Sequence, residues 1–148
     1  HKELWGQSGP VTPGAVVPLG RARTVRAGGD VTLVSWSRQV QACAQAAEQL
    51  ATQGVQAELI DLRTIWPWDR DAVLASVAKT GRLLVVHEAI QVAGFGAEIA
   101  ATVAEHTGAR VARLGAPRIP VGYAQVLEDE ARIGAGQIVA ATQQLLQR

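Results

Sequence analysis

The stretch that decides the fold is Leu83-Leu84-Val85-Val86. A continuous apolar run of this length is typical of a strand that is covered on both faces. Strands of this kind occur in parallel sheets that lie between two layers of helices. The run ends at His87, so the sequence places a polar residue at the carboxyl end of the strand, where open α/β sheets collect their ligands.

Helical periodicity flanks this strand on both sides. Apolar residues recur at helical spacing in four segments, and the expected helices cover approximately residues 37–53, 69–80, 96–107 and 136–147. Ser37 and Asp69 are expected to cap the first two helices, because their side-chain oxygens can accept unpaired backbone N–H groups. Gly54 and Gly81 are expected to end these helices. The proline-bearing segment 116–130 is expected to be a loop.

The remaining apolar segments predict the other strands. They cover residues 31–36, 55–60 and 110–114, and a weakly alternating segment at 21–26 is expected to form a hairpin with 31–36 through the turn at 28–30. Helical crossovers between strands favour parallel pairing. We therefore predict a three-layer α/β/α domain over residues 21–148, with about five strands, mostly parallel, and one antiparallel edge strand. The Gly- and Pro-rich residues 1–20 are expected to be an interdomain linker.

Composition narrows the class of protein. The net charge is +1 and no basic stripe is present, which argues against nucleic-acid binding. No apolar run approaches the roughly 18 residues that cross a bilayer, so we expect no membrane partner. Cys43 is the only cysteine and fits a reducing cytoplasm; 12 arginines against two lysines indicate a GC-rich bacterial genome. Because the sequence contains no methionine, we expect it to be a domain of a longer protein, whether it was cut by design or by proteolysis.

Several residues at the strand ends could carry chemistry. His87 and Glu88 could act as an acid–base pair, since a nearby carboxylate raises the pKa of a histidine. They could equally form a hydrogen-bonded loop or a subunit contact, because adjacent strand residues point to opposite faces. Arg63 could hold an anion or form an internal ion pair. Cys43 is expected to lie in the core, and no metal-ligand spacing, nucleophile elbow or P-loop is found.

Two loops carry aromatic residues. Gly94-Phe95-Gly96 opens a helix and could receive an anion, but it lacks the further glycine and acidic residue of a dinucleotide fingerprint, which favours a tight turn. Trp66 and Trp68 flank a proline, and at least one of them is expected to be exposed. They could belong to an interface or fasten the loop to the sheet.

Taken together, these segments resemble a known family. The motifs "VPLGRA", "DVTLVSWSRQV", "IDLRTIWPWD", "LLVVHEAIQVAGFGAEIAA" and "YAQVLED" occur in the order and spacing of the transketolase C-terminal domain. More narrowly, they resemble that domain in the β subunit of the E1 component of 2-oxo acid dehydrogenase complexes, of the pyruvate, branched-chain 2-oxo acid and acetoin types. The resemblance covers essentially the whole chain and implies the same mixed sheet.

The resemblance implies that the parent enzyme decarboxylates a 2-oxo acid on thiamine diphosphate with Mg²⁺ and passes the acyl group to a lipoyl group of the E2 component. In the family, the cofactor ligands and the activating glutamate lie outside this domain. No catalytic, cofactor-binding or metal-binding residue is therefore assigned here, and the segment alone is expected to be inactive. Which 2-oxo acid is used is not encoded in this segment.

The resemblance further implies a role in assembly. The expected partners are the E1 α subunit, a second E1 β subunit and the E2 lipoyl acyltransferase, and the segment alone is expected to self-associate. The candidate interface residues are Trp66, Trp68, His87, Glu88, Phe95, Tyr123 and Glu128. One departure from the family pattern is Gly122 before Tyr123, where many relatives have proline.

Two alternatives stay open at this point. The domain could belong to a transketolase or a deoxyxylulose-phosphate synthase. It could also be a small-ligand-binding regulatory module that uses Ser37, Arg63 and His87 at the strand ends.

Overall fold

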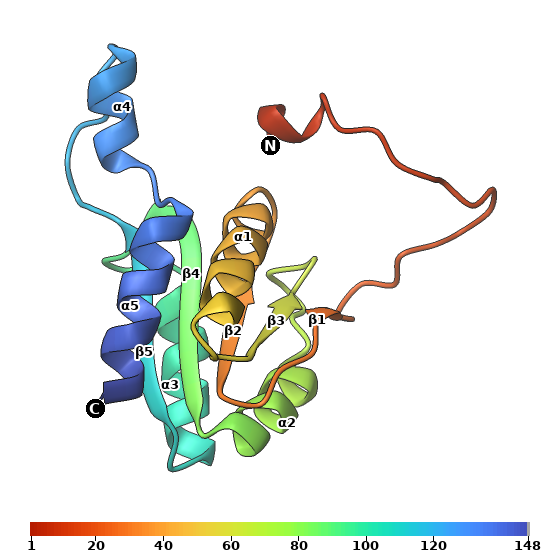
Figure 1. Ribbon diagram of the computed structural model, residues 1–148. Helices are drawn as coiled ribbons and strands as arrows, with labels where there is room; N and C mark the ends of the chain where they lie inside the picture. The colour runs from red at the N-terminus through yellow and green to blue at the C-terminus, as the bar shows by residue number, and fades with distance from the viewer. Residues whose placement is uncertain (148) are drawn as a thin grey trace.

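A mixed five-stranded sheet forms the centre of the domain (Figure 1). The computed structural model describes residues 1–147. The strands are β1 (Arg23–Arg26), β2 (Val31–Ser35), β3 (Ala57–Asp61), β4 (Arg82–Ile90) and β5 (Arg110–Ala116), in the spatial order β1-β3-β2-β4-β5. β3, β2, β4 and β5 are parallel, and β1 pairs antiparallel with β3. The predicted mostly parallel sheet with one antiparallel edge strand is confirmed.

Helices cover both faces of the sheet (Figure 1). The helices are η1 (Lys2–Leu4), α1 (Gln39–Thr52), α2 (Arg70–Thr80), α3 (Gly96–His106), α4 (Gln125–Ala131) and α5 (Ala135–Gln147). One core lies under α1 and α5 and the other under α2 and α3. The three-layer arrangement is therefore also confirmed.

The decisive strand β4 contributes to both cores. Leu84 and Val86 belong to the core under α1 and α5, whereas Leu83 and Val85 belong to the core under α2 and α3. All four side chains are fully buried, and each such side chain stabilises the fold by about 1.5–3 kcal/mol. Because both faces of β4 are buried, no alternate position faces water, and this explains the continuous apolar run.

The helix ends follow the sequence signals in part. Asp69 caps α2, since its carboxylate accepts the N–H of Ala72 at 3.2 Å, and Gly81 ends this helix with a left-handed φ of 67°. The expected cap by Ser37 is wrong. Ser37 has a φ of 57°, and the residue at the cap position of α1 is Arg38, whose side chain makes no capping hydrogen bond.

The expected hairpin between residues 21–26 and 31–36 is also wrong. β1 pairs with β3 instead, because the N–H groups of Gly29 and Asp30 donate to the Gln56 carbonyl, both at 3.0 Å. This ties the turn to the start of β3. A Cβ on Gly28 would lie 2.3 Å from the Ala57 backbone, so the glycine permits this close approach.

The two edges of the sheet share a pattern of charged residues. The two edge strands each carry two arginines: Arg23 and Arg26 on β1, Arg110 and Arg113 on β5. The segment 116–130, expected to be a loop, instead contains most of α4, which projects beyond the carboxyl end of the sheet (Figure 1). None of the helices within residues 1–147 is long and apolar enough to span a bilayer.

Candidate interaction surface at the carboxyl end of the sheet

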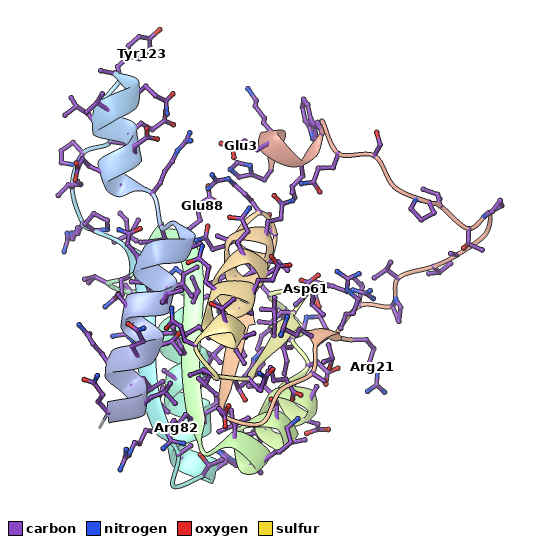
Figure 2. All side chains as sticks on the ribbon, in the orientation of Figure 1. Glu3, Arg21, Asp61, Arg82, Glu88 and Tyr123 are labelled. Atoms are coloured by element: carbon purple, nitrogen blue, oxygen red, sulfur yellow. The ribbon has the colours of Figure 1, made fainter. Side chains whose placement is uncertain are left out.

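The residues singled out in the sequence lie at the carboxyl end of the sheet or on the segments that extend from it. They form three groups: a partly buried aromatic cluster around His87, an exposed loop and an acidic cavity. Figure 2 shows Glu3, Glu88 and Tyr123 at this end of the molecule and Arg82 at the opposite end. We describe the three parts in turn.

The aromatic cluster consists of Trp36, His87, Phe95 and Trp68. The His87 ring stacks on Trp36, with ring centres 5.5 Å apart and planes 16° from parallel. Phe95 packs edge-on against Trp36 at 5.9 Å and against Trp68 at 6.4 Å. Trp36, which was not among the sequence candidates, directly follows β2, and its position at a strand end is the signal that could have identified it. The cluster joins the ends of β2 and β4 to the start of α3.

His87 is fully buried within this cluster. Its Nδ1–H donates to the Ala89 carbonyl at 2.9 Å, and among residues 1–147 its Nε2 has no hydrogen-bond partner. Burial lowers the pKa of His87; the Ala89 hydrogen bond opposes this shift, and the charge of Arg113 adds to it. The ring is therefore held as a neutral imidazole.

The hypothesis that Glu88 raises the pKa of His87 is wrong. Glu88 points away from the ring into solvent, and its carboxylate contacts the His1 ring at 2.8 Å. Adjacent strand residues point to opposite faces, and the structure shows this arrangement. The geometry does not support an acid–base pair.

Three glycines enclose the His87 ring. A Cβ on Gly94, Gly96 or Gly115 would lie 2.6–2.7 Å from an atom of the imidazole. Gly96 is the first residue of α3, Gly94 precedes it in the turn, and Gly115 lies on β5. This close packing supports the tight-turn interpretation of the Gly94-Phe95-Gly96 segment.

The loop that carries the two tryptophans gives each a different environment. Trp68 is half-buried and packs against Phe95, whereas Trp66 is 79% exposed. The Thr64 hydroxyl donates to the Pro67 carbonyl at 2.7 Å and accepts the N–H of Gly20 at 3.0 Å. Trp68 therefore fastens the loop to the sheet, and Trp66 is presented to solvent.

A cavity of about 380 Å³ lies between η1, α4 and the ends of β4 and β5. Its charged lining includes Glu3, Glu88, Glu128 and Arg132. Arg132 pairs with Glu128 at 3.0 Å and with Glu3 at 3.4 Å. The remaining walls are mostly apolar and include Ile90, Ala116, Pro117, Ile119 and Val121. The cavity combines an apolar surface with an excess of carboxylates, a combination that accommodates a cationic group on an apolar stem.

Tyr123 lies at the tip of the projecting arm (Figure 2) and is fully exposed. The glycine before it has a structural reason, because a Cβ on Gly122 would lie 2.4 Å from the Cβ of Leu127. The glycine thus lets α4 pack closely on this turn.

The remaining sequence candidates do not form a ligand site with His87. Ser37 and Arg63 both have left-handed backbone conformations, with φ of 57° and 59°, while the glycine wall separates the His87 ring from solvent. Cys43 is fully buried in the core, as predicted, and this burial raises the pKa of its thiol to about 12. Within residues 1–147, no group of three or more His, Cys, Asp or Glu side chains is placed to hold a metal ion.

The fold is a three-layer α/β/α domain with a mixed sheet, and the candidate interaction surface lies at the carboxyl end of that sheet. The family model described as transketolase, C-terminal domain, matches residues 20–138. The chain belongs to the transketolase C-terminal domain family, as the sequence motifs predicted.

Curated relatives narrow the similarity. The chain is 41% identical to the pyruvate dehydrogenase E1 component subunit beta of Dictyostelium discoideum, over 90% of this chain and 38% of that protein. It is 40% identical to the acetoin:2,6-dichlorophenolindophenol oxidoreductase subunit beta of Cupriavidus necator, over 99% of this chain and 45% of that protein. The chain thus spans less than half the length of these relatives.

Solved structures agree on the fold. The chain superposes on a split gene transketolase, described as an inactive beta4 tetramer, with a TM-score of 0.83 and 26% identity, over 93% of this chain and 46% of that one. A 2-oxoglutarate:ferredoxin oxidoreductase from Magnetococcus marinus matches with a TM-score of 0.57 and 13% identity, which shows the shared fold alone.

Proposed function

We propose that this chain is the C-terminal assembly domain of the β subunit of a thiamine-diphosphate-dependent 2-oxo acid dehydrogenase E1 component. The parent enzyme would decarboxylate a 2-oxo acid and transfer the acyl group to a lipoyl group of E2, and the buried single cysteine is compatible with its location in a reducing bacterial cytoplasm. The identity of about 40% to β subunits of this class supports the parent assignment.

The observation that supports an assembly role is the exposure of large aromatic side chains at the carboxyl end of the sheet. Trp66 and Tyr123 expose most of their aromatic surface, and such side chains are enriched at the centres of interfaces. The acidic cavity lies on the same end. Trp66, Trp68, Glu88, Phe95, Tyr123 and Glu128 are accordingly our candidates for contacts with E1 α, a second E1 β and E2. His87 is fully buried, so we propose for it only an indirect role, through the aromatic residues that it supports.

The residues present do not fit thiamine diphosphate or its magnesium ion. The cavity at the strand ends is lined by Glu3, Glu88 and Glu128, against one arginine, Arg132, and this excess of carboxylates disfavours an anionic diphosphate. No step of the decarboxylation is therefore derived from this domain, which we expect to be inactive alone. Calorimetry with thiamine diphosphate and Mg²⁺ tests this, and micromolar binding by the isolated chain would contradict it.

The assembly role is tested on the full-length β subunit, co-expressed with its α subunit. Glu128→Gln removes one cavity carboxylate, and we expect it to weaken E2 binding about tenfold, as loss of one charged partner commonly does. Glu105→Gln is the matched control, because Glu105 is exposed on α3, which does not line the acidic cavity. Surface plasmon resonance measures both variants. Equal E2 affinity for the two variants would argue against docking at the cavity.

Self-association is a further part of the proposal. The isolated chain exposes apolar side chains on the arm, including Val121, Val126 and Leu127, and such patches promote association. The similar split gene transketolase is described as a beta4 tetramer. We expect sedimentation equilibrium to detect dimers or larger species, and a strict monomer at high concentration would contradict this.

The second candidate function is that of a C-terminal domain of a transketolase or a deoxyxylulose-phosphate synthase. The superposition on the split gene transketolase favours it, whereas the sequence identities favour the dehydrogenase. Assay of the parent enzyme separates the two. 2-Oxo-acid-dependent dye reduction supports the dehydrogenase, and ketol transfer between sugar phosphates supports the alternative.

A further inference from the structure

The His87 ring stacks on Trp36 in the aromatic cluster, and Phe95 and Trp68 connect this cluster to the loop that carries Trp66. We propose that neutral His87, with its proton on Nδ1, is the positioning residue of this surface, and that protonation of Nε2 releases the Gly94–Gly96 turn and the loop that presents Trp66. The relevance of this device to assembly rests on the proposed function, but its structural basis does not.

The first observation is that one nitrogen is used and the other is enclosed. Nδ1 donates to the Ala89 carbonyl at 2.9 Å, which fixes this proton in the neutral ring. Nε2 is buried without a partner among the described residues. The Cβ positions of Gly94 and Gly96 would lie 3.2 and 2.6 Å from it. A second proton would therefore place an N–H donor and a charge against glycine backbone that offers no acceptor, which is costly.

The second observation is that the ring is mechanically connected to both loops. Phe95 lies between the two glycines in sequence and packs edge-on against Trp36, which stacks on His87. Phe95 also packs against Trp68, and Trp68 follows Trp66 across a single proline. Displacement of the His87 ring would therefore disturb the turn directly and the tryptophan loop through two aromatic contacts.

The third observation concerns the charges around the ring. On β5, the Arg113 guanidinium donates to the Gln91 carbonyl at 3.2 Å, and its charge opposes protonation of His87. On β4, the Glu88 carboxylate lies on the other face and pairs with His1. On α3, the first-turn carboxylate of Glu98 is exposed.

The two loops next to Trp36 and Trp68 also lack a free counter-charge for the imidazolium. Arg38 pairs with Glu3. The Asp69 carboxylate already accepts the N–H groups of Ala22 and Ala72. Within the part of the chain that the structure describes, these elements offer the protonated ring no carboxylate partner.

The direction of the pH effect follows from this environment. Burial lowers the pKa of His87 in the folded state, so the unfolded state binds protons first as the pH falls below the ordinary histidine value of about 6.5. The stabilisation by neutral His87 is complete above that value. It decreases as the pH falls toward the lowered pKa of the folded state.

Histidine-ring ¹⁵N NMR tests the proposal on the 148-residue chain. We expect a neutral Nδ1–H tautomer at about pH 8, persisting below about pH 6.5 where exposed histidines are protonated. When His87 does titrate, the amide signals of Gly94, Phe95 and Gly96 should move with the same midpoint, and so should the indole N–H of Trp68. Titration of His87 near the ordinary value, with these signals unchanged, would overturn the proposal.

Two variants separate positioning from simple packing. His87→Asn retains a side-chain N–H donor for Ala89 but cannot titrate in this range, so it should keep the turn in place and abolish the linked pH response. His106→Asn is the matched control, since His106 is exposed, and it should leave the response intact. A His87→Asn protein that shows the wild-type pH profile contradicts the proposal. If His87→Asn does not fold, the wild-type tautomer and turn signals decide.

Binding by the parent enzyme connects the device to assembly. We expect E2 binding to weaken about tenfold across the pH interval in which NMR shows His87 to titrate in the wild type, and less than about threefold across the same interval in His87→Asn. Equal weakening in both proteins would contradict control by His87. If E2 does not bind at any pH, the proposed function fails, while the NMR result still decides the role of His87.

Discussion

At the amino end of the sheet the hydroxyl of Thr32 is hydrogen-bonded to Ser76 and Thr80, at 2.7 and 2.8 Å, whereas at the carboxyl end Trp66 and Tyr123 contact little of their own domain. Both ends lie beyond the same four parallel strands, so the fold does not impose the difference. The amino end uses its polar groups to hold α2 on the sheet. The carboxyl end leaves Trp66 and Tyr123 exposed, which is why we propose it as the interaction surface.

The comparison also holds for charge. At the amino end, Glu58 is bound by Lys79 and by the N–H of Gly28. At the carboxyl end, Glu3, Glu88 and Glu128 surround a cavity. The Glu58 carboxylate is thus largely buried among its donors, whereas the cavity carboxylates pair with His1, Arg38 and Arg132 at the surface and stay partly exposed.

The largest expected loss of stability follows from an added methyl group next to the His87 ring. Gly115→Ala would place a Cβ 2.7 Å from His87 and 2.9 Å from the Ala89 carbonyl, and such overpacking should destabilise the fold by about 3 kcal/mol. Gly108→Ala is the control, because its Cβ meets nothing within 4 Å. Urea denaturation measures both. Similar stability of the two variants would show that the glycine wall is pliable.

The next prediction concerns the hydrogen bonds of Thr32 at the amino end of the sheet. Thr32→Val keeps the shape of the side chain and removes the hydroxyl that joins Ser76 to Thr80, and we expect a loss of about 2 kcal/mol. Thr24→Val makes the same change at an exposed position of β1 and should alter stability by less than about 0.5 kcal/mol. A Thr32→Val protein as stable as the control would remove the main distinction between the two ends.

A smaller effect is expected from the carboxylate at the amino end. Burial alone would raise the pKa of Glu58, but hydrogen bonds from Lys79, Ser76 and the Gly28 N–H together lower it. Its contribution is therefore present above the ordinary pKa of about 4.3 and is lost as the pH falls through the lowered folded-state value.

Glu58→Gln should accordingly cost about 1 kcal/mol at neutral pH, and the difference from wild type should vanish in acid. Glu48→Gln, at an exposed position of α1, is the matched control and should show no such convergence. Thermal unfolding as a function of pH measures both. A constant difference for Glu58→Gln at all pH values would contradict the ionic origin of its effect.

The smallest effect on stability is expected for a change at Trp66, which should instead weaken the association of subunits. Trp66 is 79% exposed, so Trp66→Ser should change the free energy of unfolding by less than about 0.5 kcal/mol. The same change should weaken association of the parent subunits, as loss of an interface tryptophan commonly does. Differential scanning calorimetry and sedimentation velocity measure the two effects. A large loss of stability would place Trp66 in the fold rather than in the interface.

The sequence predicted the layers and the strand directions because burial on two faces leaves a continuous apolar run, as at residues 83–86. It could not predict which strand lies beside β1. That choice depends on the approach of Gly28 to Ala57, a contact between distant segments. Helix α4 was missed because it is short and lies in a segment with few buried apolar residues, of which Ala131 is one.

The candidate site was predictable only in outline. The exposure of Trp66 follows from its place beside a proline in a loop, and the resemblance to a family indicated the arm with Tyr123. The cavity was not predictable, since Glu3, Glu88 and Glu128 meet only in three dimensions. The burial of His87 depends equally on glycines from α3 and β5.

The arginines on the two edge strands bear on the aggregation of the isolated chain. Unpaired strand edges can recruit further strands and so nucleate aggregates, and charged side chains on an edge oppose this. Arg23 and Arg26 on β1, with Arg110 and Arg113 on β5, place like charges where two copies would meet edge to edge. The chain can therefore expose aromatic and apolar side chains at the carboxyl end of its sheet, while the charged edge strands oppose the growth of fibres.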